Sequence, residues 1–144
     1  MGLLDNIFKS KERRKKQCHI KNLLLVAASN DDIAPNELDF LIKVANRIGI
    51  SREDFAQVLR SPGDIDFYPP ESDFERIDQL DDLVRMMLVD GDIDNEEVIT
   101  CQKFAIMLGF KPEIIDLILG HILDAAIKNM RRELVIDRLS SLIK

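Results

Sequence analysis

Two stretches of this chain are copies of one another, and they decide the fold. Residues 23–55 read LLLVAASNDDIAPNELDFLIKVANRIGISREDF, and residues 83–115 read LVRMMLVDGDIDNEEVITCQKFAIMLGFKPEII. A shift of 60 positions aligns them without a gap. The aligned identities include Asp32 with Asp92, Glu37 with Glu97, and Gly49 with Gly109. Two copies are too few for a solenoid, so the repeat predicts one pseudo-symmetric domain.

The spacing of apolar residues shows what each copy is made of. Apolar residues recur at i, i+3, i+7 and i+10 in both, and no segment alternates convincingly with period two. These residues are Leu38, Leu41, Ala45 and Ile48 in the first copy, and Val98, Cys101, Ala105 and Leu108 in the second. We therefore expect an all-α protein, a compact single-domain bundle of about seven helices with an internal pseudo-twofold repeat.

Helix ends can also be read from the residues. Ala34 and Asp94 stand at N-cap positions, and Glu37 and Glu97 fall three residues later, where a carboxylate can accept backbone N–H groups. The glycines at 49 and 109 suit the left-handed position that ends a helix. Ser72 opens a further helix.

The repeat units, at about 23–60 and 83–120, are part of a larger helical domain. We expect an N-terminal arm at 1–16, a helical domain at 17–144, a linker at 61–71, and helix from Pro112 onward. The linker, SPGDIDFYPPE, has three prolines and a glycine, which forbid a helix. Its aromatic residues could form a docking strip, but we expect them to pin the linker to the core. The segment after Pro112 reads as one long helix or two helices nearly in line.

Composition bounds the functional classes. The chain has 144 residues, 46% of them hydrophobic, and a net charge of −6, which argues against nucleic-acid binding. Two cysteines form no disulfide framework, and no apolar run approaches the ~18 residues of a membrane span. We expect a cytoplasmic protein with reduced thiols, in which Cys101 is buried because it replaces Leu41. His19 and His121 lack companions at ligand spacing, so we expect surface or half-buried positions.

The acidic turns before the second helix of each copy are candidate cation sites. Asp90, Asp92 and Asp94 are spaced like the first ligands of an EF-hand, but Asn95 and Cys101 replace its glycine and bidentate glutamate. Capping does not require the identity of Asp32 with Asp92. The predicted ligands are Asp90, Asp92, Asp94, Glu97, Asp32 and Glu37. Carboxylates favour calcium or magnesium over zinc. The alternative is a solvated turn whose acids favour the helix N-terminus.

The N-terminal segment, MGLLDNIFKSKERRKK, combines an apolar face with a basic block. Residues 9–16 carry a charge of +5, which leaves −11 for the rest of the chain. The predicted contact residues are Leu3, Leu4, Ile7 and Phe8, followed by Lys9, Lys11, Arg13, Arg14, Lys15 and Lys16. This arm could dock on an anionic membrane surface, bind an acidic protein partner, or have no binding role.

The two acidic segments carry a family resemblance. SNDDIAPNELDFLIKVANRIGIS (29–51) and VDGDIDNEEVITCQKFAIMLGFKPE (89–113) resemble the signature segments of TerB-like domains, found in tellurite-resistance proteins and a membrane-bound co-chaperone. The resemblance covers residues 20–125. It implies an all-helical pseudo-twofold fold, a metal site carried onto Asp90, Asp92, Glu97, Asp32 and Glu37, and roles in stress responses or membrane-linked assemblies.

No catalytic constellation is recognisable, since nucleophile sets, phosphate loops and dinucleotide fingerprints are absent from the sequence. We therefore expect a non-enzymatic TerB-like module that binds a divalent cation through its acidic turns, with a stress-related or unknown role. The alternative is an adaptor to a protein or a membrane surface, tethered by the basic arm, with purely structural acidic turns.

Overall fold

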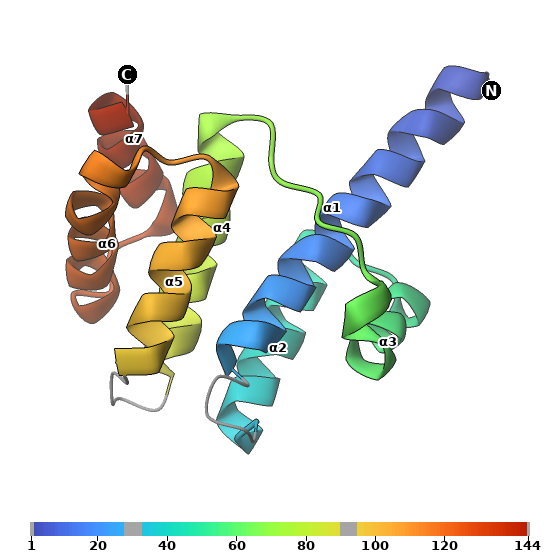
Figure 1. Ribbon diagram of the computed structural model, residues 1–144, viewed down its shortest axis with the longest axis horizontal. Helices are drawn as coiled ribbons and strands as arrows, with labels where there is room; N and C mark the ends of the chain where they lie inside the picture. Colours follow the sequence, from blue (N-terminus) through green and yellow to red (C-terminus); the bar gives the residue numbers. More distant parts are fainter. Residues whose placement is uncertain (1, 28–32, 90–94, 144) are drawn as a thin grey trace.

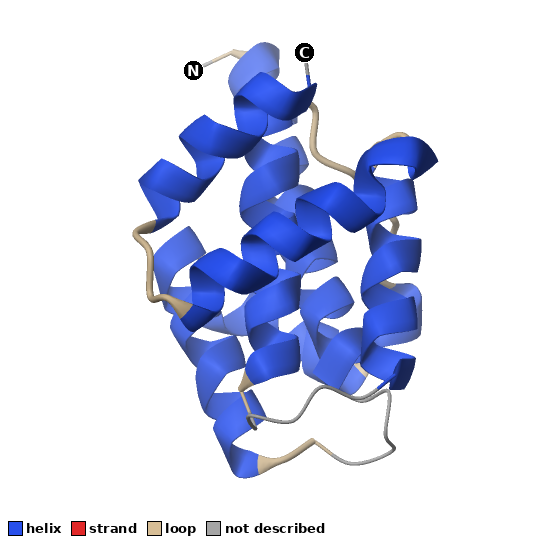
Figure 2. Cartoon of the chain, turned by 90° about the vertical axis from the view of Figure 1, so that its left-hand side faces the viewer, coloured by secondary structure: helices blue, strands red, loops and turns tan. Residues whose placement is uncertain are grey.

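The computed structural model describes residues 2–27, 33–89 and 95–143. In this part of the chain, all regular structure is helical (Figure 2). The helices are α1 (Leu3–Ala27), α2 (Pro35–Ile48), α3 (Arg52–Arg60), the short 3-10 helix η2 (Pro62–Asp64), α4 (Asp73–Leu88), α5 (Asn95–Leu108), α6 (Pro112–Ile127) and α7 (Arg132–Ile143). The predicted all-α bundle of seven helices is confirmed.

The repeat is visible in the arrangement of these helices. The bounds of α2 and α5 differ by 60 residues at both ends, and α3 and α6 also begin 60 residues apart. Helices α1 and α4 pack against each other in the middle of the bundle (Figure 1). Each also contacts the second helix of the other copy, since α1 packs on α5 and α4 on α2. Such reciprocal contacts are those of a pseudo-twofold arrangement.

The helix ends follow the local chemistry read from the sequence. At the start of α2, the backbone N–H of Ala34 donates to Glu37 Oε1 at 3.0 Å. The second-copy cap, at Asp94, lies outside the described residues. Gly49 and Gly109 have φ of 76° and 109°, so both helices end in a turn that favours glycine. Ser72 Oγ accepts the N–H of Glu75 at 3.1 Å and starts α4.

The linker at 61–71 contains no α-helix and is fastened to α1. The N–H of Tyr68 donates to Cys18 Sγ at 3.2 Å, and Lys21 Nζ donates to the carbonyl of Ile65 at 2.9 Å. Phe67 is exposed, whereas Pro70 and Ile65 are buried. The attachment of the linker therefore depends on its backbone and on Ile65 more than on its aromatic rings.

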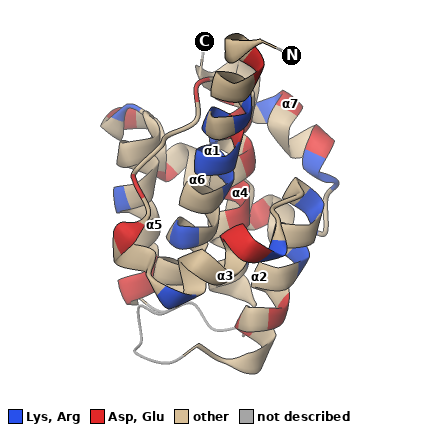
Figure 3. Ribbon diagram, turned by 90° about the vertical axis from the view of Figure 1, so that its right-hand side faces the viewer, with Lys and Arg blue, Asp and Glu red and all other residues tan. Residues whose placement is uncertain are grey.

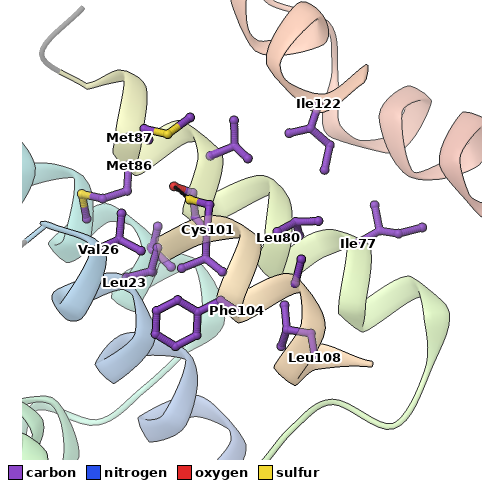
Figure 4. Packing of buried hydrophobic residues seen from close by; sticks show 14 of the residues in the cluster. Leu23, Val26, Ile77, Leu80, Met86, Met87, Cys101, Phe104, Leu108 and Ile122 are labelled. Atoms are coloured by element: carbon purple, nitrogen blue, oxygen red, sulfur yellow. Dashed lines mark hydrogen bonds between the residues drawn. The ribbon is translucent and has the colours of Figure 1, made fainter. Parts of the chain in front are cut away.

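The core lies between the two copies, where apolar side chains of α1, α4 and α5 interdigitate (Figure 4). Cys101 is 0% exposed and sits among them, as predicted. Burial raises the pKa of its thiol to about 12, so the thiol stays neutral and behaves as an apolar residue. Cys18 is also buried, and burial raises its pKa as well.

The C-terminal segment is two helices, but they are not in line. The chain reverses between α6 and α7, and α7 returns to pack on α4 and α6 (Figure 2). The reversal uses Asn129, whose φ is 56°, and Met130, whose N–H donates to the carbonyl of Ala125 at 2.9 Å. Asparagine tolerates this left-handed conformation better than most residues. The expected in-line continuation is wrong because Val135, Ile136 and Leu139 are buried in the core.

The predicted boundary at residue 16 does not coincide with a helix end. Helix α1 runs without a break from Leu3 to Ala27. Residues 2–9 are exposed, whereas residues 18–27 are almost all buried. The first half of α1 therefore projects beyond the body of the bundle (Figure 1). None of the helices in the described ranges combines the length and apolar character needed to cross a bilayer.

Candidate functional site

The projecting end of α1, residues 2–11, is the first candidate site. Four large apolar side chains lie on it in contact with solvent: Leu3, Leu4, Ile7 and Phe8 are 76%, 81%, 46% and 64% exposed. Their spacing places them on one side of the helix, and Lys11 continues that side one turn after Ile7. Exposed apolar groups clustered in this way mark interaction surfaces more often than scattered single residues do.

The basic residues behind this apolar end fall into two groups. Arg13 donates twice to Asp54 of α3, from Nε at 2.9 Å and from Nη2 at 2.8 Å. Lys15 Nζ lies 3.4 Å from Glu12 and 3.7 Å from Glu75 of α4. Arg13 and Lys15, both predicted contact residues, therefore hold α1 to the body.

The other four basic residues are Lys9, Lys11, Arg14 and Lys16, and none of them forms an ion pair in the described part of the chain. Figure 3 shows basic positions along α1. The contact with Arg13 lowers the pKa of Asp54 and raises that of Arg13. The pair is therefore ionised at neutral pH, and it fixes the direction in which the free end points.

Interfacial amphipathic helices lie in the plane of a membrane surface and bury one apolar face, so their apolar side chains must share a side of the helix. Leu3, Leu4, Ile7 and Phe8 meet this condition, and two basic residues, Lys9 and Lys11, follow them in the sequence.

The predicted cation ligands are placed only in part. Asp32, Asp90, Asp92 and Asp94 lie outside the described residues. Glu37 is buried, and its Oε1 is committed to the cap of α2. Glu97 is buried in the first turn of α5. Within the described ranges, no three His, Cys, Asp or Glu side chains are grouped to hold a metal. The cation site therefore stays a prediction based on the sequence.

A second cluster, which the sequence did not predict, is a buried ionic network on α4. Asp82 is 0% exposed and accepts three hydrogen bonds. His19 Nε2 of α1 lies 2.8 Å from its Oδ2, Arg132 Nη2 of α7 lies 2.6 Å from its Oδ1, and Arg47 of α2 also donates to Oδ2. Acidic positions line α4 where it faces α1 (Figure 3).

Asp78 and Asp81 extend this network. Arg132 Nη1 lies 2.7 Å from Asp78 Oδ1 and 3.2 Å from Asp81 Oδ2, and Arg85 Nε donates to Asp81 Oδ2 at 2.8 Å. Three carboxylates thus face three guanidinium groups and one imidazole. The network joins four helices, α1, α2, α4 and α7, through charge-assisted hydrogen bonds.

Burial and charge act in opposite directions on the two central acids. Burial alone would raise the pKa of Asp82, but His19, Arg132 and Arg47 outweigh it and the pKa is lowered. Burial dominates at Asp81 and raises its pKa, although Arg85 and Arg132 oppose the shift. The pKa of Arg132 is raised because Asp82, Asp78 and Asp81 outweigh the penalty of its own burial. The network is best described as structural, because guanidinium groups already pair with its carboxylates.

The expectation of a surface or half-buried His19 is wrong. His19 is 3% exposed, whereas His121 is exposed. A lone histidine gave no ligand pattern, and its partner Asp82 is 63 positions away in the sequence. One signal was available: Asp81 and Asp82 stand within the apolar stripe of α4, between Leu80 and Leu83, and buried acids require cations opposite them.

The chain matches no known protein family, no characterised protein and no solved structure. Its function must therefore be argued from its own residues.

Proposed function

We propose that the chain is a non-enzymatic adaptor that docks on anionic membrane surfaces through the projecting end of α1. The observation that carries this proposal is the exposure of Leu3, Leu4 and Phe8 on a helix end that the body leaves uncovered. The unpaired Lys9 and Lys11 stand directly behind it. The acidic body would face away from the bilayer, since like charges repel.

The apolar and the basic residues would each contribute a significant free energy to membrane binding. Burial of a Leu or Phe side chain is worth about 1.5–3 kcal/mol when complete. Each basic residue near an anionic leaflet adds about 1 kcal/mol. Partial insertion of four apolar residues with two or three basic ones supports reversible, peripheral attachment. Arg13 contributes by holding the end in its outward direction through Asp54.

Co-sedimentation with vesicles tests the proposal. The full chain is mixed with vesicles of phosphatidylcholine alone or of phosphatidylcholine with phosphatidylserine. We expect retention on the anionic vesicles, and a decrease as salt rises because screening weakens the attraction. Leu4→Glu with Phe8→Glu should abolish retention, and Lys9→Glu with Lys11→Glu should reduce it strongly.

The matched control reverses two exposed lysines of the body, Lys43→Glu and Lys103→Glu, with the same change in charge. Equal losses in this control and in the Lys9, Lys11 variant would show that only net charge matters and would overturn the proposal. So would retention that does not respond to the Leu4, Phe8 variant.

A second candidate function is uptake of a divalent cation by the acidic turns, as the resemblance to TerB-like domains implies. One observation favours it: the cap of α2 is completed by Ala34 and Glu37, so capping leaves the identity of Asp32 with Asp92 unexplained. An ion at ~100 times its Kd stabilises a protein by about 2.7 kcal/mol. Thermal unfolding with calcium, magnesium, manganese and zinc should show a shift that Asp90→Asn with Asp92→Asn removes. No shift with any ion would exclude this function.

A further inference from the structure

A cavity in the second copy of the repeat is used by neither function proposed above. It has a volume of about 210 Å³ and lies between α4, α5 and α6. Its wall is mainly apolar and includes the side chains of Val84, Met87, Val98, Leu119 and Leu123. Cys101 adds a small side chain, and Gly120 adds only backbone. The thiol of Cys101 is neutral, so it adds no charge to this wall.

The repeat explains why the cavity is in this copy. Position 101 corresponds to Leu41, and position 120 corresponds to Arg60. The second copy thus has a smaller side chain at one wall and none at the other. A Cβ placed on Gly120 would meet no atom within 4 Å, so the space beside this glycine is open.

The polar groups of the cavity are at its rim. Gln102 Nε2 donates to Asp116 Oδ1 at 3.2 Å, and both residues line the cavity. A carboxylate has about four lone-pair sites, so Asp116 can accept further donors after this bond. A ligand there would have an apolar body inside and a hydrogen-bond donor directed toward Asp116.

We infer that this cavity is a binding site for a small, ring-sized apolar molecule that carries one hydrogen-bond donor. An apolar protein cavity of ~150 Å³ is large enough to bind benzene. The present cavity is somewhat larger, which leaves room for a fused ring such as indole. Apolar lining with a few placed polar groups is the usual composition of small-molecule sites.

Indole and indene are the probes, because they have nearly the same shape and only indole has an N–H donor. Titration of the full chain is followed by NMR of the methyl groups of Val84, Val98 and Leu123. We expect both to shift these signals in a saturable way, with indole binding at least tenfold more tightly. Asp116→Ala should bring indole to the affinity of indene.

Two variants fill the cavity from opposite walls: Gly120→Leu from the rim and Cys101→Leu, as in the first copy, from the inside. Gly120→Ala is the matched control, since it restores a helix-forming side chain and leaves most of the space open. We expect the two leucine variants to lose at least tenfold in indole affinity and the alanine variant to keep it. The spectrum without ligand establishes that each variant is folded.

Failure of both probes to shift the three methyl signals would overturn the inference. Equal affinity for indole and indene would also overturn it, because Asp116 would then have no part in recognition. Equal binding by Gly120→Leu, Cys101→Leu and the native chain would place the ligand elsewhere.

Discussion

The two copies of the repeat share a backbone but present different surfaces. Helices α2 and α5 have the same length and end at equivalent glycines. The outer positions of α2 are Asp39, Asn46 and Arg47, and the equivalent positions of α5 are Ile99, Ile106 and Met107. Arg47 reaches the buried Asp82, whereas Met107 remains exposed. The copies therefore conserve what forms the helices and differ in what those helices contact.

The two central helices, α1 and α4, also differ in what their equivalent positions contact. Position 82 in α4 corresponds to Asn22 in α1, and both side chains are buried. Asp82 has three charged or polar partners, whereas the amide of Asn22 has one long contact, 3.9 Å from Cys18 Sγ. Helix α7, which has no counterpart in the first copy, supplies Arg132. Helix α7 therefore helps to compensate the buried charge of Asp82 in the second copy, and the first copy has no helix that could do the same for an acid at position 22.

The largest effect should come from removing the acid of this pair. Asp82→Ala removes the most buried acceptor of Arg47 and Arg132 and the partner of the buried His19. Loss of one partner from a buried ionic network costs about 3–5 kcal/mol. Asn22→Ala should cost about 1 kcal/mol, because it removes one weak hydrogen bond. Urea unfolding followed by circular dichroism measures both. Equal costs would mean that the two helices are equivalent despite their partners.

Core substitutions should show a smaller difference between the copies. Leu41 and Cys101 occupy equivalent, fully buried positions. Leu41→Ala should lower the free energy of unfolding by about 2–5 kcal/mol, since the surrounding core does not fully collapse. Cys101→Ala should cost about 1 kcal/mol, because one sulfur is lost beside an existing cavity. The same urea experiment compares them, and a larger cost at Cys101 would contradict the comparison.

The two turn glycines should differ less, but in a defined order. Gly49 lies in the ordinary left-handed region, where an alanine costs about 1–2 kcal/mol. Gly109, at φ 109°, lies outside it, and an added Cβ would meet Arg76 Nε at 3.1 Å. That Nε donates to the carbonyl of Leu108 at 3.0 Å. Gly109→Ala should therefore lower the melting temperature more than Gly49→Ala, and the reverse order would be inconsistent with these backbone angles.

The smallest expected effect is on the slope of stability against pH. The pKa of Asp82 is lowered in the folded chain, from an unfolded value of about 3.9. Its contribution is therefore complete above about pH 4 and is lost as pH falls through the folded pKa. The raised pKa of Asp81 opposes this loss. Unfolding free energies at a series of acidic pH values should fall less steeply for Asp82→Asn than for the native chain. Parallel profiles would show that Asp82 is not the group responsible.

The sequence predicted local features well because they depend on neighbouring residues. Helix ends at Ala34, Gly49 and Ser72 result from bonds within a few residues, so periodicity and capping located them. Burial of Cys101 followed from its equivalence with Leu41. The apolar end of α1 was also recognised, but which of its basic residues are free was not. Arg13 and Lys15 are used internally because α3 and α4 place Asp54 and Glu75 beside them.

What the sequence by itself determined is the all-helical class, the helix ends at Ala34, Gly49, Ser72 and Gly109, and the duplication, since a helix is specified by spacing and caps along the chain. Only the tertiary structure decided which charged groups meet. Asp82 joins His19, Arg47 and Arg132 from three other helices, and no periodicity relates those positions. An apolar stripe tells which face of a helix is buried, but any apolar face can contact any other. The ionic partners depend on which faces pack together, and on where α7 turns back.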